Sequence, residues 1–256
     1  MIYYFSATGN CKHVANQIAN AIDDRAVSIE ETEYNIELKK EEVLGFVTPT
    51  YFWELPGIVR RFMSDAEITL NGDNYTFLIS TYGTTPGCSA EEARHVLSEN
   101  GILLDASYSI KMPDNWTVWF DLSDPEKVAS QNARADFAIQ KVIERIRRRD
   151  LGNHQKPRAP YFVKTFTDSA FESARRCENF HLEDTCIGCG ICAKNCPVSA
   201  IEIKDGKAFW VKEQCELCFR CLHHCPKFSI QYGNGATKKH GQYVHPECNK
   251  GNSVPE

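Results

Sequence analysis

The stretch CIGCGICAKNCP, residues 186–197, places four cysteines at gaps of two, two and three residues and ends in a proline. The stretch CELCFRCLHHCP, residues 215–226, repeats this spacing at an offset of 29 residues. The repeat continues beyond the prolines, because Ala200-Ile201 corresponds to Ser229-Ile230. The last third of the chain is therefore an internal duplication built around eight of its 12 cysteines.

The spacing of these cysteines is that of ligands for iron–sulfur clusters. A two-residue gap lets one tight loop aim three thiolates at three irons of a cubane, and the fourth ligand has to come from elsewhere. The pattern resembles that of bacterial-type ferredoxins, in which the fourth cysteine of each run serves the other cluster. This resemblance implies two [4Fe–4S] clusters, one held by Cys186, Cys189, Cys192 and Cys225 and the other by Cys215, Cys218, Cys221 and Cys196.

Zinc binding and disulfide bonding are the alternative interpretations of these cysteines. A zinc site needs four ligands in two pairs and gives no reason for a third cysteine two residues further on. Disulfides form in oxidising compartments, and the N-terminal sequence MIYYFSATGN has neither the basic region nor the long apolar run of a secretory signal. We therefore expect reduced thiolates in a cytoplasmic protein of a cell poor in oxygen.

The composition is that of a globular protein with more than one domain. Of the 256 residues, 42% are hydrophobic and 25% are charged, and no run of about 20 apolar residues predicts a membrane span. The cysteine runs leave about 180 residues to explain, which is enough for a separate domain.

The charge of the chain is uneven. Residues 1–150 carry a net charge of −8 and residues 151–256 a net charge of +3. The acidic first part argues against nucleic acid binding and is compatible with docking to a basic redox partner. An ordinary solvated surface explains the same charges.

The first 150 residues alternate between apolar runs and amphipathic segments. We expect strands at residues 1–5, 25–29, 43–47, 75–80 and 102–111 and helices at 10–22, 58–63, 89–99 and 125–149. Ser89 and Glu92 are spaced as a capping box, and Asp124 before Pro125 is an expected N-cap. This alternation predicts an α/β fold with a doubly wound, five-stranded parallel sheet.

Three loops leave the carboxyl ends of the expected strands, where sheets of this kind bind ligands. They comprise residues 6–11, 48–56 and 81–88. The first loop offers hydroxyls and backbone N–H groups at the start of a helix, which favours an anion. It has no lysine and no G-x-G-x-x-G pattern, so a monophosphate suits it better than a nucleoside triphosphate or a dinucleotide. A plain hydroxyl-rich turn explains the loop as well.

The first loop resembles the phosphate-binding loop of flavodoxins, (S/T)-x-T-G-N-(T/S), which surrounds the phosphate of FMN. Cys11 departs from this pattern, since it stands where a hydroxyl is usual. The resemblance implies that the phosphate is bound by Ser6, Thr8, Gly9, Asn10 and Cys11. The other two loops resemble the flavin-ring loops of the same fold, which implies ring contacts from Thr50, Tyr51, Phe52, Trp53, Thr81, Tyr82, Gly83, Thr84 and Gly87. Trp53 or Tyr51 is expected to stack on the ring and to tune its potential.

The order of the parts resembles that of bacterial flavodoxin–ferredoxin fusion proteins. It implies a flavodoxin-like FMN-binding domain at residues 1–150 and a small α+β ferredoxin-like domain with two [4Fe–4S] clusters at 183–232. Between them we expect a linker and connecting helix at 151–182, with a strand and then a helix from residue 161. The tail at 233–256 is expected to be flexible or to lie as an arm on the body.

Several residues have no decisive pattern. Cys11, Cys88 and Cys177 are interpreted as small buried hydrophobic side chains rather than redox thiols. The aromatic loop 112–121 is expected to cover the flavin or to form an interface. For the pair His223-His224 we expect either tuning of a cluster or exposure to solvent. The tail residues do not have the spacing of a closed metal site, although they include His240, His245 and Cys248.

Three functions are compatible with these features. The first, and our preferred hypothesis, is an electron carrier that passes single electrons between FMN and two clusters and to or from a redox partner protein. The second is an FMN-dependent reductase of a small molecule, for which the available proton donors are Glu54, Tyr51, Tyr82 and Asp114. The third is redox sensing, in which a cluster orders or releases the tail. Neither nucleic acid nor a membrane is an expected partner.

Overall fold

The computed structural model describes residues 1–156 and 164–249. The contacts among these residues divide them into two units. The first unit contains residues 1–6, 10–113, 130–156 and 164–167, and the second contains residues 7–9, 114–129 and 168–249. The second unit thus adds the loop 7–9 and the segment 114–129 to the cysteine runs. The domain limits expected from the sequence stay predictions.

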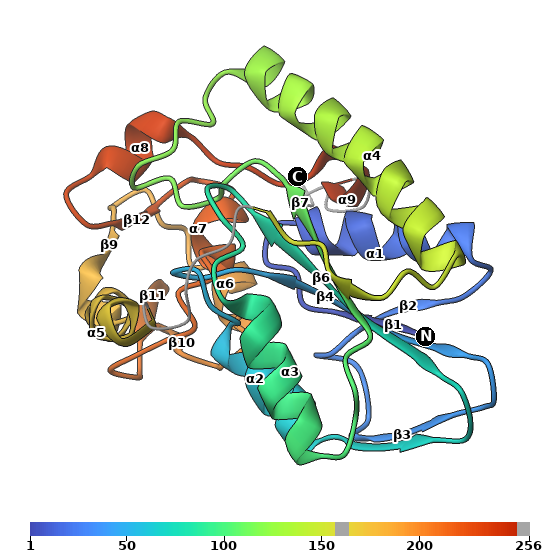
Figure 1. Ribbon diagram of the computed structural model, residues 1–256. Helices are drawn as coiled ribbons and strands as arrows, with labels where there is room; N and C mark the ends of the chain where they lie inside the picture. Colours follow the sequence, from blue (N-terminus) through green and yellow to red (C-terminus); the bar gives the residue numbers. More distant parts are fainter. Residues whose placement is uncertain (157–163, 250–256) are drawn as a thin grey trace. The chain divides into compact units, whose positions relative to one another are not determined.

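A parallel sheet forms the centre of the first unit. Within the described residues it has six strands in the order β2-β1-β4-β6-β7-β8 (Figure 1). They are β1 (Ile2–Tyr4), β2 (Ala26–Ser28), β4 (Val43–Pro49), β6 (Tyr75–Tyr82), β7 (Ala106–Lys111) and β8 (Gly152–Asn153). The order reverses at β1, as in doubly wound folds. The predicted α/β fold and its five strands are confirmed, and β8 adds a short sixth strand at one edge.

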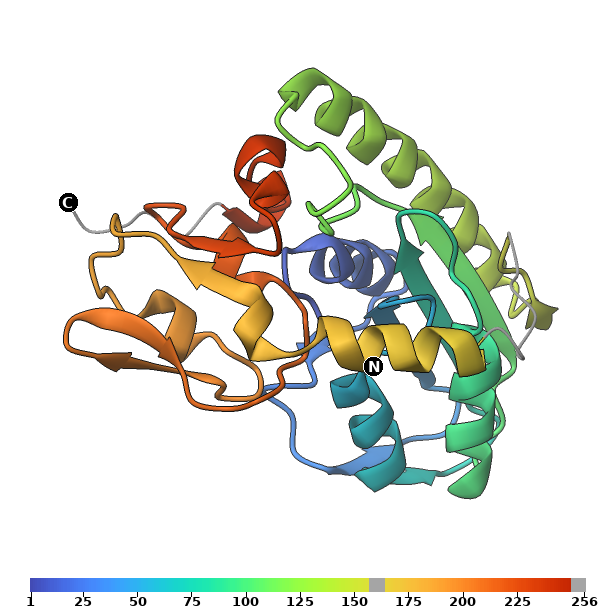
Figure 2. The same ribbon diagram turned by 90° about the vertical axis from the view of Figure 1, so that its left-hand side faces the viewer.

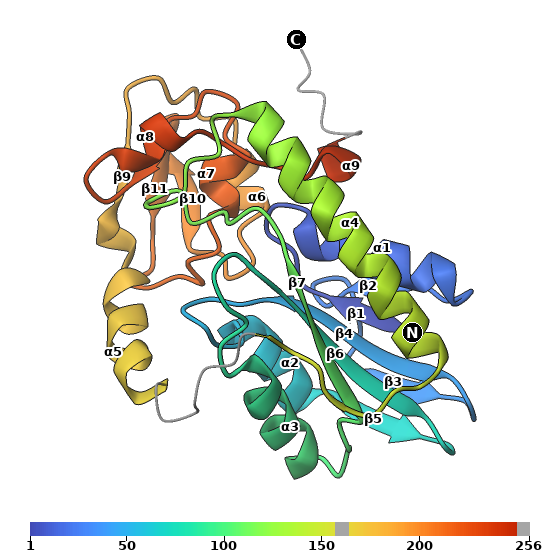
Figure 3. The ribbon, with the colours of Figure 1, turned by 45° about the horizontal axis from the view of Figure 1, so that its top comes forward.

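Helices cover both faces of this sheet. The elements α1 (Asn10–Ala21) and α4 (Pro125–Arg147) lie on one face, and α2 (Gly57–Asp65) and α3 (Ser89–Glu99) lie on the other (Figure 3). On the first face, Ile18 of α1 and Ile139 of α4 share a buried cluster with Phe77 of β6. On the second face, Phe62 of α2 lies 5.5 Å from Tyr3, measured between ring centroids. Ile2 belongs to the first cluster, so the neighbouring residues Ile2 and Tyr3 of β1 serve opposite layers.

A second parallel pair was not expected from the sequence. The strands β3 (Asn35–Leu38) and β5 (Glu67–Leu70) pair with each other and form a separate two-stranded sheet. In β3 the buried residues Ile36 and Leu38 alternate with exposed ones. Four residues of such alternation are too few to stand out from a polar connection.

The caps of two helices had been predicted from the sequence. At α4 the prediction is confirmed, because Asp124 Oδ1 accepts hydrogen bonds from the N–H groups of Glu126 at 2.9 Å and Lys127 at 3.1 Å. At α3 the capping box is wrong, since the N-cap is Cys88 and no side chain caps the helix. The carboxylate of Glu92 instead accepts a hydrogen bond from Leu55 N–H at 2.7 Å. A tertiary contact has replaced the local cap.

The second unit consists of short elements around the two cysteine runs. The helix α6 (Ile191–Lys194) begins inside the first run and α7 (Arg220–His223) begins inside the second. The strands β10 (Ile201–Lys204) and β11 (Lys207–Trp210) form a hairpin, seen in orange in Figure 2. A second antiparallel pair joins β9 (Phe180–Leu182) to β12 (Ile230–Tyr232).

The connecting segment and the tail contain further helices. The expected helix of the connection is α5 (Lys164–Ala174), and the strand expected before it falls on residues outside the described ones. The tail contains α8 (Ala236–His240) and α9 (Pro246–Asn249). Over residues 1–156 and 164–249, none of the helices combines the length and the apolar character that crossing a bilayer requires.

Candidate cluster and flavin sites

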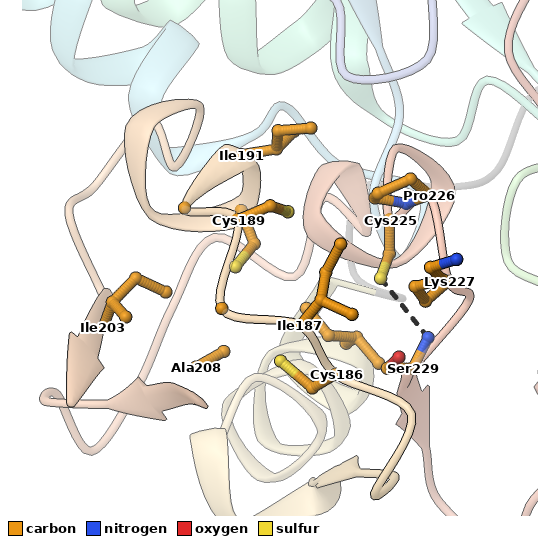
Figure 4. Close-up of a pocket in the computed structure, with 14 residues that line it drawn as sticks. Cys186, Ile187, Cys189, Ile191, Ile203, Ala208, Cys225, Pro226, Lys227 and Ser229 are labelled. Atoms are coloured by element: carbon orange, nitrogen blue, oxygen red, sulfur yellow. Dashed lines mark hydrogen bonds between the residues drawn. The ribbon is translucent and has the colours of Figure 1, made fainter. Parts of the chain in front are cut away.

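The first cavity of the second unit is surrounded by thiols from both cysteine runs. It is lined by Cys186, Cys189 and Cys192 of the first run and by Cys225 of the second. Figure 4 shows Cys186, Cys189 and Cys225 around one space, together with side chains such as Ile187. These four cysteines are the set that the ferredoxin resemblance assigns to one cluster.

The second cavity has the complementary set of cysteines. Its thiols belong to Cys215, Cys218, Cys221 and Cys196. Its wall is aromatic where that of the first cavity is aliphatic, since Phe180, Trp210 and Phe219 line it. The rings of Phe180 and Trp210 are stacked, with centroids 5.4 Å apart.

Backbone N–H groups point at several of these sulfur atoms. Ala200 N–H donates to Cys196 Sγ at 3.2 Å, and 29 residues later Ser229 N–H donates to Cys225 Sγ at 3.3 Å. Leu217 N–H donates to Cys215 Sγ, also at 3.3 Å. Such donors stabilise negative charge on sulfur, so they favour thiolate ligands.

Burial keeps three other thiols of the two cavities protonated when no cation is near. It raises the pKa of Cys192 to about 11 and the pKa of Cys218 to about 12, and it raises the pKa of Cys221 well above its ordinary value. Metal binding therefore has to release protons from these groups. The 12 cysteines, all within the described residues, are free thiols, which disagrees with the disulfide interpretation.

Cys177 lies beside the second cavity rather than in it. It is buried, as expected, and its N–H donates to Glu213 O at 2.7 Å. Its thiol is hydrogen-bonded to the thiol of Cys215, one of the cavity cysteines. The cysteine spacing does not predict this contact, because Cys177 belongs to neither run.

The loop after β1 presents its backbone, and the side chains of Asn10 and Cys11 are already engaged. Asn10 Nδ2 donates to Pro113 O at 3.0 Å. Cys11 is 1% exposed, its Sγ lies 3.1 Å from Thr81 Oγ1, and burial raises its pKa to about 12. The interpretation of Cys11 as a small buried side chain is confirmed, so only its backbone N–H remains for an anion. Thr8 is buried, and Gly9 has a φ of +95°.

The loops after β4 and β6 are joined to each other. Thr50 N–H donates to Thr81 O at 3.1 Å, and Cys88 N–H donates to Trp53 O at 2.9 Å. A Cβ on Gly87 would lie 1.9 Å from Trp53 O, so only glycine fits this approach. The indole of Trp53 is 41% exposed, and its Nε1 donates to Thr84 Oγ1 at 3.2 Å.

The other predicted ring residues also belong to these two loops. Phe52 and Trp53 both have positive φ, of 49° and 69°. Tyr51 and Glu54 are bridged through their backbones, with both hydrogen bonds at 3.0 Å. Tyr82 ends β6, and its hydroxyl donates to Lys156 O at 3.1 Å. Gly83 follows it in the turn toward α3.

Two buried carboxylates fix the base of the Trp53 loop, and sequence reasoning missed this role. Glu92 of α3 accepts from Leu55 N–H and, at 3.1 Å, from Arg60 Nη2. Glu54 lies 3.6 Å from the same guanidinium. Both glutamates are less than 5% exposed. The capping-box spacing concealed the true partner of Glu92, which lies 37 residues away in the sequence.

His223 is a buried hydrogen-bonding centre and does not face solvent. Tyr243 N–H donates to its Nδ1 at 3.1 Å, so the proton of the neutral ring lies on Nε2, which donates to Asn115 O at 2.9 Å. Burial lowers the pKa of His223 to about 4. His224 Nε2 is 3.1 Å from Ala7 O. The alternative of exposure to solvent is therefore wrong for His223, whereas His224 is half-buried.

Among the described tail residues, up to Asn249, there is no single-ion metal site. Over the part of the chain that the structure describes, no three His, Cys, Asp or Glu side chains converge closely enough to hold one metal ion. His240 Nδ1 is instead 2.7 Å from Thr117 O.

Two known families match separate parts of the chain. Residues 1–101 match the family described as a flavodoxin domain, and residues 179–226 match the family described as a 4Fe-4S dicluster domain. The chain therefore joins an N-terminal flavodoxin domain to a 4Fe-4S dicluster domain.

Individual relatives resemble smaller parts. A ferredoxin of Pyrobaculum islandicum (strain DSM 4184 / JCM 9189 / GEO3) is 38% identical over 56 residues, which are 22% of this chain and 52% of the ferredoxin. The chain thus spans about half the length of this curated relative. Among solved structures, rubredoxin oxygen:oxidoreductase from Desulfovibrio gigas matches with a TM-score of 0.32 and 11% identity, over 55% of this chain and 35% of that one. That similarity is too low to support an argument.

Proposed function

We propose that this protein is an electron carrier that passes single electrons between FMN and two [4Fe–4S] clusters, and to or from a redox partner protein. The observation that carries the proposal is the pair of cavities, each with three cysteines of one run and the fourth cysteine of the other. FMN takes up one or two electrons and a cubane takes up one, so a chain with both centres converts electron pairs into single steps.

The residues around the two cavities suit cubane clusters. Four thiols surround each space, and backbone N–H groups are directed at Cys196, Cys215 and Cys225. The remaining walls are mostly apolar side chains, which keep water from the thiolates. Cys186, Cys189, Cys192 and Cys225 would hold one cluster, and Cys215, Cys218, Cys221 and Cys196 would hold the other.

The residues of the first domain suit FMN. The helix α1 begins directly after the loop 6–9 and has no acidic residue in its first turn, which favours a phosphate at its N-terminus. Ser6, Thr8 and the backbone from Gly9 to Cys11 would bind this phosphate. The indole of Trp53 is 41% exposed on a loop fixed by Gly87, so it is available to lie against the ring.

The aromatic loop 112–121 supports a carrier over a reductase. Trp116 stacks on Phe219 of the second cysteine run, with ring centroids 4.9 Å apart and an angle of 14° between the planes. Both rings belong to the second unit, so this packing favours a structural role of the loop over a substrate pocket. Of the proton donors considered for a reductase, Glu54 is buried beside Arg60, and Asp114 accepts a hydrogen bond from Trp116 N–H at 3.0 Å.

The partner and the location follow from charge and thiol chemistry. The net charge of −8 on residues 1–150 supports a basic redox protein as the partner. Reduced, cluster-forming cysteines support a cytoplasmic protein of a cell poor in oxygen.

Rapid mixing of the anaerobic, cofactor-loaded protein with a limiting amount of dithionite tests this function. A carrier should distribute the electrons between flavin and clusters, seen as matched changes in flavin absorbance and in the EPR signals of the reduced clusters. A Cys218→Ala variant should lose one of these signals and serves as the control. Flavin and clusters that take up electrons without exchanging them would contradict the proposal.

A further inference from the structure

The residues 236–249, here called the C-terminal arm, are fixed at their start by buried hydrogen bonds. Thr237 is fully buried, and its Oγ1 donates to Gln231 Oε1 at 2.7 Å and accepts from Tyr232 N–H at 3.2 Å. Further along, Gln242 Nε2 donates to Leu222 O at 2.7 Å and to Cys225 O at 2.8 Å. The arm is thereby attached to the end of the second cysteine run.

Beyond Gln242 the arm closes a ring of hydrogen bonds with the phosphate loop. Tyr243 N–H donates to His223, and His223 donates to Asn115 O. Asn115 Nδ2 donates to Thr8 Oγ1 at 3.4 Å. His245 N–H then donates to Thr8 O at 2.8 Å, which leads back to the arm. Thr8 is therefore held through both its side chain and its carbonyl.

The arm also packs tightly against Gly9. A Cβ on this glycine would lie 2.9 Å from the Cβ atoms of both His245 and Cys248. Cys248 Sγ donates to Gly9 O at 3.5 Å. Two residues before Gly9, the carbonyl oxygen of Ala7 lies 3.1 Å from His224 Nε2. Three consecutive residues of the phosphate loop thus contact either the arm or the end of the second cysteine run.

We propose that the C-terminal arm holds the phosphate loop in its anion-binding conformation, with Gln242, Tyr243 and His245 as positioning residues for the FMN phosphate. The inference rests on the proposed FMN site. Backbone N–H groups bind a phosphate well only when they already point at it, because ordering a free loop costs part of the binding free energy. Cys11 lacks the usual hydroxyl, so this loop depends on backbone donors more than a flavodoxin loop does.

The test compares cluster-loaded protein with two variants of the arm. Gln242→Ala removes two hydrogen bonds of the arm without touching the loop, and a chain ending at Gly241 removes the contacts of residues 242–249. The matched controls are Lys239→Ala, at an exposed position of the arm, and a chain ending at Asn249. Cluster absorbance near 400 nm verifies that each variant keeps its cluster domain.

Two measurements distinguish a failure of the proposed role of the arm from a failure of the proposed FMN site. In flavin-free protein, hydrogen exchange at the amides of residues 7–10 should be at least about fivefold faster in both variants than in their controls. In titrations followed by flavin fluorescence, the Kd for FMN should rise by about tenfold for Gln242→Ala and more for the shorter chain.

Unchanged exchange together with an unchanged Kd would overturn the role of the arm. If the unaltered chain binds no FMN, the proposed flavin function fails, and the exchange rates alone decide whether the arm holds the loop.

Discussion

The two cysteine runs share one backbone and differ in the side chains that it carries. Positive φ recurs at the 29-residue offset, at Gly188 and Leu217, with 65° and 53°, and at Gly190 and Phe219, with 78° and 57°. The helices α6 and α7 start and end at corresponding residues. The first run uses glycine at both positions, whereas the second uses large side chains.

This difference shows what the second run gains from a strained backbone. A left-handed conformation costs a non-glycine residue about 1 kcal/mol. Phe219 is 2% exposed, stacks on Trp116 and lies 5.1 Å from the ring of Tyr232. Burial of such a ring contributes about 2 kcal/mol or more, so it offsets the strain. Aromatic side chains line the second cavity as a result, whereas at the first cavity Ile187 is 57% exposed.

The largest effect is expected when the fourth cysteine of either run is replaced by alanine. Cys225→Ala should abolish the cluster of Cys186, Cys189 and Cys192, and Cys196→Ala should abolish the other, because each cavity then lacks one thiolate. Iron analysis should fall by about half in each variant. EPR of the reduced protein should show that Cys225→Ala loses the same signal as Cys189→Ala. Loss of the signal that Cys218→Ala removes would mean that the runs do not cross.

The next effect is the loss of the packed ring. Phe219→Ala should lower the free energy of unfolding by about 3 kcal/mol, because the strain remains while the packing is lost. Thermal unfolding of cluster-loaded protein measures this, with Phe209→Ala as the control, since that ring is 52% exposed in the hairpin. Equal destabilisation by the two substitutions would show that the buried Phe219 ring stabilises the fold no more than an exposed ring does.

A smaller effect is expected at the corresponding glycine of the first run. Gly188→Ala should cost about 1–2 kcal/mol, because its Cβ would meet Gly206 O at 2.3 Å in the β10–β11 turn and because its φ is positive. Gly206→Ala is the control, since its φ is also positive but a Cβ there would meet no atom within 4 Å. Equal unfolding temperatures for the two variants would show that the close approach to Gly206 O does not contribute to the destabilisation.

The smallest effect is a difference in reduction potential between the two clusters. A reduced cluster carries one more negative charge, which an enclosed apolar site disfavours. Cys189 is exposed at the first cavity, whereas Cys218 is buried at the second. The first cluster should therefore have the higher potential, by on the order of tens of millivolts. An EPR-monitored redox titration measures both values, and the reverse order would contradict this role of burial.

The sequence predicted features that depend on local spacing and missed those that depend on distant contacts. The cysteine gaps define both cavities, because a loop of two residues between thiols fixes their directions. The apolar runs predicted the strands β1, β2, β4, β6 and β7 of the main sheet. The capping box at Glu92 failed, since a buried N–H of Leu55 competes for the carboxylate. Residue patterns also do not predict the hydrogen bond between His245 and Thr8, because these two residues are 237 positions apart in the sequence.

The central claim is that one chain holds one FMN and two [4Fe–4S] clusters. Its most direct test is the quantification of iron, acid-labile sulfide and extracted flavin in one anaerobically purified sample. The account predicts about eight irons, about eight sulfides and about one FMN per chain. About four irons per chain, or eight irons without flavin, would contradict it.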